Sequence, residues 1–297
     1  GHAGRSRAFG DIMKITDAHA HVFSDDEARY PILDSARKRP AHIGTVPHLQ
    51  QQMASAGVQR VVAIHTSMTY GFDNRFLTDT ARAHAPWMAG VCTLHPEDPE
   101  SPDLLRRLVG EANVRGMRSV PAGQPERHLD YSVEKHLDDP RVDALWQTAE
   151  DLGIVINALI RLPLADELEV MLGRHPNLSV VLDHCMFAHG SDGIEGETLQ
   201  KTLHLARYPN LHAKLTWLVA GSDQESPFAD TPPLLRAVID AYGPDRCVWG
   251  SDFPCEFYTP KTTYAGHLEL FRQELGLSVA EQEAILSSTP GRLWFGE

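Results

Sequence analysis

Short apolar segments alternate with longer amphipathic segments along most of this chain. The short segments are rich in β-branched residues and apolar on both faces, as strands of a parallel sheet covered by helices are. We expect eight strands, at Lys14–Ala18, Arg60–His65, Met88–Leu94, Gly116–Val120, Ile154–Ile160, Leu178–Asp183, Leu211–Thr216 and Arg246–Trp249.

The longer segments carry apolar residues at spacings of three and four, which predicts amphipathic helices. They lie at Val46–Ala56, Arg75–Ala85, Pro102–Asn113, Asp138–Leu152, Ala165–Arg174, Glu197–Arg207, Pro232–Tyr242 and Thr262–Leu275, with a terminal helical segment at Ser278–Phe295. Several end in a glycine turn, which is typical of helix C-caps.

Alternation of strands and helices over residues 13–297 predicts an α/β fold, a single (β/α)8 TIM barrel, regular or distorted. A doubly wound open sheet is the alternative, but it usually carries a glycine-rich turn after its first strand. Here that strand leads into His19-Ala20-His21. Residues 1–12 are interpreted as a tag remnant or a disordered extension.

Charge and cysteine content exclude several classes of protein. The 297 residues include 27 Lys and Arg against 40 Asp and Glu, a net charge of −13, which argues against nucleic-acid binding. No apolar run reaches the ~18 residues of a membrane span. The four cysteines show no metal or disulfide spacing, which favours reduced thiols and a cytoplasmic location. A small-molecule substrate is expected, and assembly into a homo-oligomer stays open.

Catalytic residues of such a barrel lie where strands end and the following loops begin. His19 and His21 are two residues apart and so share one face of a strand. With 16 His in the chain, about one His-x-His pair is expected by chance, so position rather than spacing carries the argument. His184 and Asp252 also directly follow predicted strands. Together, these four residues form a nitrogen and oxygen donor set that suits zinc, manganese or iron.

The order of motifs resembles that of the amidohydrolase superfamily, and most of all its lactonase branch, which includes 2-pyrone-4,6-dicarboxylate lactonase and sugar-acid lactonases. The main matches are Asp17-x-His19-x-His21, Asp183-His184 and Gly250-Ser251-Asp252-x-Pro254. Further matches are Gly71-Phe72-Asp73-Asn74, Gly116-Met117-Arg118, Lys214-Leu215-Thr216 and the ending from Ala284 to Phe295.

The resemblance implies that His19, His21, His184 and Asp252 form the catalytic centre, with Asp252 as general base for water attack on a lactone. It also implies that these four residues are the ligands of a divalent metal, with zinc preferred over manganese, while metal-independent action stays open. A metal-dependent decarboxylase acting on a small aromatic or semialdehyde carboxylate is the alternative on the same barrel. A barrel that binds a ligand without turnover is a third hypothesis, and the complete donor set argues against it.

Basic residues at strand ends are candidates for binding a carboxylate-bearing or sugar-acid substrate, because guanidinium groups pair with carboxylates. The proposed substrate-binding residues are Arg118, Arg161, Lys214, His65, Tyr70 and Trp217. Each basic residue could instead form an ion pair within the barrel wall, and His65 and His95 could simply support the site. The sequence departs from the pattern of the branch at Cys185–Ala188, Trp217 and Asn157. These positions fall in the expected pocket wall, so the departures bear on the identity of the substrate more than on the fold.

Overall fold

The computed structural model describes residues 13–121, 136–216 and 218–297, and these form one eight-stranded parallel sheet in the order β1 to β8. The strands are β1 (Thr16–Ala20), β2 (Arg60–Ile64), β3 (Met88–Cys92), β4 (Val114–Ser119), β5 (Val155–Ala158), β6 (Val180–Leu182), β7 (Leu211–Leu215) and β8 (Cys247–Trp249). The sequential strand order confirms the predicted barrel.

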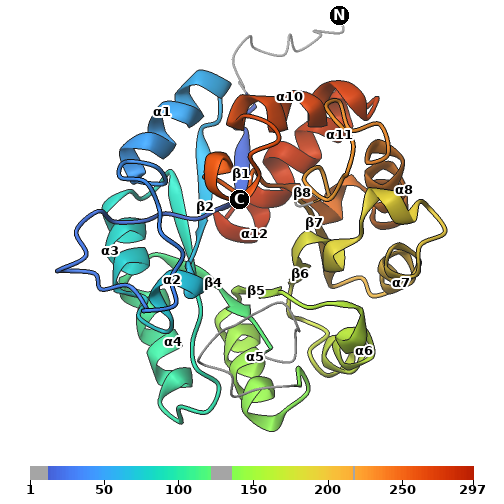
Figure 1. The fold of residues 1–297 in the computed structure, drawn as a ribbon. Helices are drawn as coiled ribbons and strands as arrows, with labels where there is room; N and C mark the ends of the chain where they lie inside the picture. Colours follow the sequence, from blue (N-terminus) through green and yellow to red (C-terminus); the bar gives the residue numbers. More distant parts are fainter. Residues whose placement is uncertain (1–12, 122–135, 217) are drawn as a thin grey trace, which may run out of the picture.

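Helices surround this sheet, so that the strands form the inner ring and the helices the outer one (Figure 1). The outer helices are α1 (Val46–Ala56), α3 (Arg75–Ala83), α4 (Ser101–Glu111), α5 (Pro140–Leu152), α6 (Ala165–Arg174), α7 (Glu197–Leu205), α8 (Pro232–Tyr242) and α10 (Tyr264–Glu274). Short helices α2 (Ser67–Tyr70) and α9 (Cys255–Tyr258) lie in the loops that follow β2 and β8.

Local sequence explains where the outer helices begin and end. The Thr45 side chain accepts a hydrogen bond from the backbone of His48 at the start of α1, which satisfies a donor that the helix leaves free. Gly57 ends α1 with a φ of 73°, and Gly153 ends α5 with a φ of 69°. This left-handed conformation favours glycine, so the predicted glycine turns are confirmed.

The sheet is nearly closed into a barrel by residues just beyond β8. Ala20 of β1 forms an isolated parallel bridge with Phe253. The backbone amide of His21 donates to Phe253, and that of Asp252 donates to His19, both at 2.9 Å. Closure of the barrel therefore places Asp252 beside the two histidines of β1.

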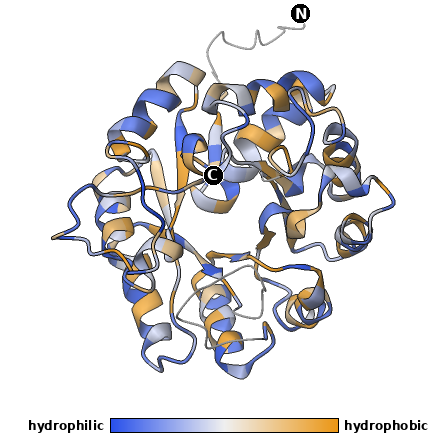
Figure 2. Ribbon diagram, in the orientation of Figure 1, coloured by the Kyte–Doolittle hydropathy of each residue, from blue (hydrophilic) through white to orange (hydrophobic). Residues whose placement is uncertain are grey.

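Apolar side chains fill the barrel interior and the layer between strands and helices. The interior cluster combines strand residues such as Val62 and Val181 with Trp294, which belongs to the terminal helix α12 (Thr289–Trp294). Hydrophobic and hydrophilic residues alternate along the outer helices, as expected for helices with one buried face (Figure 2). Burying one such aliphatic side chain contributes roughly 1.5–3 kcal/mol.

The structure departs from the sequence prediction at several element boundaries, including those of β1, β6 and the terminal helical segment. β1 begins and ends two residues later than expected, so His19 lies within the strand. The terminal helical segment divides into α11 (Val279–Glu283), a π-helical turn at Ala284–Ser288 and α12. β6 ends at Leu182, and a left-handed turn follows it. In the described parts of the chain, no helix has both the length and the apolar character needed to cross a membrane.

Candidate active site

The two histidines of β1 converge at the end of the strand. Their Nε2 atoms lie 3.1 Å apart, and both side chains are buried. The pairing of β1 with β2 shifts register between Asp17 and Ala20, and such irregularities redirect side chains. The structure therefore places the side chains of His19 and His21 next to each other, and their role in a functional site stays a prediction.

Asp252 approaches this pair from the loop after β8. Its Oδ1 atom lies 3.4 Å from Nε2 of His19 and 3.7 Å from Nε2 of His21. The residue has a φ of 58°, a left-handed conformation that Asp adopts more readily than most residues. Gly250 makes the approach feasible, because a Cβ atom there would lie 2.5 Å from the Cβ of His19.

Three donor atoms fit a divalent metal. Nitrogen atoms of His19 and His21 and a carboxylate oxygen of Asp252 all lie within 4.8 Å of one another. Nδ1 of His21 lies 3.0 Å from the carbonyl oxygen of Ile64. Because that contact requires a proton on Nδ1, it leaves the Nε2 lone pair available for a metal. Two imidazoles and one carboxylate are also the ligands that catalytic zinc sites use.

His19 is enclosed by polar neighbours as well as by the barrel wall. Burial lowers its pKa well below the usual value, and the nearby Lys214 and His184 lower it further. Its Nδ1 atom lies 3.0 Å from Nζ of Lys214. His19 is therefore a neutral imidazole near pH 7.

His184 lies beside the donor set with both ring nitrogens in contact with other side chains. Its ring centroid is 4.7 Å from that of His19. Nδ1 contacts the hydroxyl of Thr216, and Nε2 lies 3.3 Å from a guanidinium nitrogen of Arg118. The structure thus brings all four predicted residues together, with the Nε2 atom of His184 facing Arg118. Its role as a metal ligand stays a prediction.

Asp183 joins three strands beneath the site. Its carboxylate lies 2.8 Å from Nε of Arg118 on β4 and 2.9 Å from Nζ of Lys214 on β7. Asn157 on β5 also donates to it, at 3.3 Å. Arg118 and Lys214 were predicted to bind substrate. Both form ion pairs in the barrel wall, and their substrate roles stay predictions. Lys214 is completely buried and contacts the centre through His19.

The other residues predicted to bind substrate each contact a different part of the protein, as far as the structure describes them. Arg161 lies over the ring of Phe187 at 4.1 Å. His65 contacts the carbonyl of Gly71 at 2.7 Å, and burial lowers its pKa to about 4. This is the supporting role considered for it in the sequence. The hydroxyl of Tyr70 accepts a hydrogen bond from the Ser24 backbone. Trp217 lies outside the described residues.

His95 and His212, two further histidines in or after strands, contact backbone groups. Nδ1 of His95 accepts a hydrogen bond from the backbone amide of Glu97 at 3.0 Å. Nδ1 of His212 lies 3.2 Å from the carbonyl of Val180. Burial lowers the pKa of His212 to about 4, helped by the charge of Arg292. These contacts tie His95 and His212 to Glu97 and Val180 rather than to His19 or His21.

Asp17, the buried carboxylate that begins the Asp17-x-His19-x-His21 motif, holds the base of the site together. Asp17 accepts hydrogen bonds from the Ser251 backbone at 2.9 Å, the Ser251 hydroxyl at 2.5 Å and the Tyr264 hydroxyl at 3.0 Å. Burial raises the pKa of Asp17, while these donors oppose the rise. Because Ser251 precedes Asp252, this cluster fixes the backbone that carries the acidic member of the site. In the sequence, the serine of the Gly250-Ser251-Asp252 motif is the feature that could have indicated this cluster.

Cys185 lies next to His184, but both residues belong to a left-handed turn with φ values of 49° and 57° rather than to a strand. The thiol is a poor candidate for a nucleophile. Burial raises the pKa of the Cys185 thiol to about 12, which keeps it protonated near pH 7.

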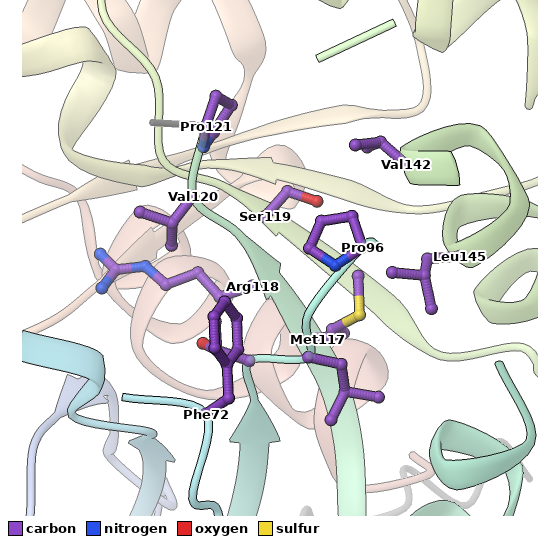
Figure 3. Close-up of a pocket in the computed structure, with 11 residues that line it drawn as sticks. Phe72, Pro96, Met117, Arg118, Ser119, Val120, Pro121, Val142 and Leu145 are labelled. Atoms are coloured by element: carbon purple, nitrogen blue, oxygen red, sulfur yellow. The ribbon is translucent and has the colours of Figure 1, made fainter. Parts of the chain in front are cut away.

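A small cavity opens where β3 and β4 end, beside α5. Its lining includes Phe72, Leu94, Met117, Arg118 and Leu145. Figure 3 shows Arg118 and Met117 extending to opposite sides of β4. The cavity is therefore bounded by the residue that contacts His184 and by an apolar wall.

Known proteins with similar sequences and structures share this architecture. The L-fucono-1,5-lactonase of Burkholderia ambifaria is 29% identical over 206 residues, which cover 69% of this chain and 68% of that one. The 2-pyrone-4,6-dicarboxylate hydrolase of Comamonas testosteroni is 23% identical over 298 residues, covering 95% and 90%. A zinc-bound amidohydrolase structure from Burkholderia multivorans superposes with a TM-score of 0.73 at 24% identity, covering 95% and 99%.

The match to a protein family extends over nearly the whole barrel. A family model described as amidohydrolase matches residues 16–296, which include β1 with its histidines and the loop after β8 that carries Asp252. The resemblance found in the sequence motifs is thereby confirmed. The chain belongs to the amidohydrolase family and is a hydrolase-type enzyme.

Proposed function

We propose that this enzyme hydrolyses the ring ester of a small lactone, with a sugar-acid or other carboxylate-bearing substrate. The observation that carries the proposal is the approach of the Asp252 carboxylate to Nε2 of His19 and His21 at the mouth of the barrel. The similarity to a sugar lactonase and to a pyrone dicarboxylate hydrolase supports the same reaction class.

Asp252 acts as the general base in this proposal. It takes a proton from water, and the water oxygen then bonds to the ring carbonyl carbon. Arg118 lies beside His184 and presents N–H groups that stabilise negative charge on the former carbonyl oxygen. The ring C–O bond breaks, Asp252 returns its proton to the leaving alkoxide, and the product is a hydroxy acid.

His19, His21 and Asp252 would hold a divalent metal, zinc in preference to manganese, with His184 as the fourth predicted ligand. When bound, the metal would supply Lewis-acid polarisation of the carbonyl group. Asp183 and Lys214 position the imidazoles from below, since Lys214 contacts both the carboxylate and His19. Burial keeps water away from these supporting groups.

The test is acid release from a panel of five- and six-membered lactones by the purified protein, with zinc, with manganese and after chelation. We expect release from sugar-acid lactones and none from Asp252→Asn. Absence of release under all three conditions would contradict the proposal. Carbon dioxide release from phenolic carboxylates, measured with the same preparation, would favour the decarboxylase alternative.

A further inference from the structure

A strained left-handed turn follows β6 and carries His184, one of the four residues predicted to form the catalytic centre. His184, Cys185, Met186 and Phe187 have φ values of 57°, 49°, 56° and 61°. Side chains of L-amino acids crowd the backbone in this conformation, and residues other than glycine normally adopt it singly. Four successive residues in it are therefore strained, and such strain persists only where the surrounding structure holds it.

The turn brings two successive side chains to the same partner. Successive residues of an extended strand face opposite sides of a sheet, so a continued β6 would separate Asp183 from His184. Instead, both contact Arg118, whose Nε donates to Asp183 at 2.8 Å and whose Nη2 lies 3.3 Å from Nε2 of His184. The left-handed backbone thus places the imidazole of His184 beside that of His19, with ring centroids 4.7 Å apart.

Neighbouring elements hold the turn in this conformation. The hydroxyl of Thr202 on α7 lies 3.3 Å from the carbonyl oxygen of Cys185, which also accepts a hydrogen bond from the backbone amide of Ala188. The Cys185 thiol donates to the carbonyl oxygen of Lys214 on β7 at 3.6 Å. Cys185 and Met186 are buried in the large apolar cluster, and this burial offsets the backbone strain.

Phe187 is the half-buried member of the turn, and its ring lies beside the imidazole of His184. A turn with three residues per revolution aligns side chains three positions apart, which puts His184 and Phe187 on one face. Their ring centroids are 5.3 Å apart. The guanidinium of Arg161, in the loop after β5, lies 4.1 Å from the centre of the Phe187 ring, within the range of a cation–π contact. Phe187 therefore connects two residues predicted to belong to the site.

We propose that Phe187 is a positioning residue, which the left-handed turn places against His184 to fix the orientation of the imidazole towards Arg118 and His19. Thr216 and Arg118 contact the two nitrogens of His184, whereas the adjacent ring of Phe187 blocks rotation of the imidazole plane. The inference goes beyond the proposed function, and only its kinetic consequence rests on lactone hydrolysis. Phe187 acts through His184 and takes no part in the bond changes.

The experiment compares Phe187→Leu, which removes the ring, with Phe187→Tyr, which keeps it. Phe76→Leu is the matched control, because Phe76 on α3 is also half-buried and packs against the rings of Tyr30 and Tyr70. NMR of protein with isotope-labelled histidine follows the imidazole of His184, whose resonance is the one that His184→Asn removes. We expect one narrow His184 resonance in the wild type, Phe187→Tyr and Phe76→Leu, and a broadened or split one in Phe187→Leu.

Kinetics of lactone hydrolysis give the second readout. Phe187→Leu should lower kcat by about 10- to 100-fold, because a misoriented imidazole impairs the chemical step. KM should stay within about twofold, since substrate binding is not the interaction that is lost. Phe187→Tyr should keep most of the wild-type kcat, and Phe76→Leu should leave it unchanged. Thermal melts should show similar losses in Phe187→Leu and Phe76→Leu, so that stability alone does not explain a difference in kcat.

Three results would overturn the proposal. They are a single narrow His184 resonance in Phe187→Leu, the same broadening in Phe76→Leu, and a rise in KM with kcat unchanged. Phe187→Met, which also lacks the ring, takes the place of Phe187→Leu if that variant does not fold. If the wild-type protein hydrolyses no lactone, the proposed function fails separately, because the His184 resonance tests the role of Phe187 without turnover.

Discussion

Nζ of Lys214 lies 3.0 Å from Nδ1 of His19, and this contact links the buried ion-pair network to the catalytic centre. Lysine has donors but no acceptor in its charged form, so Nδ1 of His19 accepts and the imidazole proton lies on Nε2. That proton points towards Nε2 of His21, 3.1 Å away, and Oδ1 of Asp252 lies 3.4 Å from the same nitrogen. A metal bound to Nε2 of His19 would require this proton to leave that nitrogen. Because Lys214 contacts Nδ1 of the same imidazole, it influences the ring that lies beside both Asp252 and the predicted metal site.

We predict that Lys214→Met lowers the free energy of unfolding by about 3 kcal/mol or more, because removing one partner of a buried ion pair leaves Asp183 undercompensated. Urea denaturation followed by circular dichroism measures the change. Lys201→Met is the matched control. Lys201 also pairs with two carboxylates, Asp166 and Glu169, but near the surface, where such pairs contribute about 1 kcal/mol or less. Equal losses in the two variants would contradict the prediction.

Zinc binding is predicted to depend on His21 far more than on any residue outside the four predicted ligands His19, His21, His184 and Asp252. Loss of an outer partner of a ligand alone costs ~10–100-fold in affinity, so His21→Asn should cost more than about 100-fold. Competition with a chromophoric chelator gives the affinity. The second group of potential ligands is His136, Asp138 and Glu167, which supplies the control. If Glu167→Gln weakens zinc binding and His21→Asn does not, the metal site has been misplaced.

Asp252→Asn should reduce kcat by about 100- to 10,000-fold, because an amide cannot accept the proton of water. Asn tolerates the left-handed backbone at this position as readily as Asp does, so the fold should persist. Steady-state acid release and a thermal melt together distinguish lost chemistry from lost structure. Asp240→Asn, on the outer helix α8, removes an exposed carboxylate and should leave kcat unchanged. Comparable losses in the two variants would count against Asp252 as the base.

The barrel could be predicted from the sequence because its periodicity is local. Each strand and helix carries its own apolar pattern, and the convergence of His19 and His21 follows from alternation along one strand. The position of Asp252 followed from the common end at which all parallel strands of a barrel finish. The sequence therefore located the central cluster without any information about contacts.

The supporting network could not be predicted, because it depends on which strands face each other inside the barrel. Arg118 and Lys214 are distant in the chain, and only the closed sheet places both on Asp183. Charge alone marked Arg118 and Lys214 as candidates for substrate binding, and it could not show that each pairs with the buried carboxylate of Asp183.

Acid should destabilise the fold partly through His267, on α10. Its Nε2 atom contacts the Thr259 hydroxyl at 2.9 Å, and burial lowers its pKa from 6.5 to about 4. The folded form therefore binds fewer protons than the unfolded form between these values, so stability falls as pH drops from about 6.5 towards 4. Each pH unit in that window costs about 1.4 kcal/mol for this group.

His267→Gln isolates this contribution, because the amide can still bond Thr259 but does not titrate. Between pH 7 and pH 5, the wild-type protein should lose about 2 kcal/mol more unfolding free energy than the variant, since only the interval below about 6.5 counts. Urea denaturation at both pH values gives the difference. His42→Gln, at a side chain that is 92% exposed, serves as the control and should follow the wild type. If His267→Gln instead retained the wild-type pH dependence, acid sensitivity would have to arise from other groups, such as the buried His65 and His212.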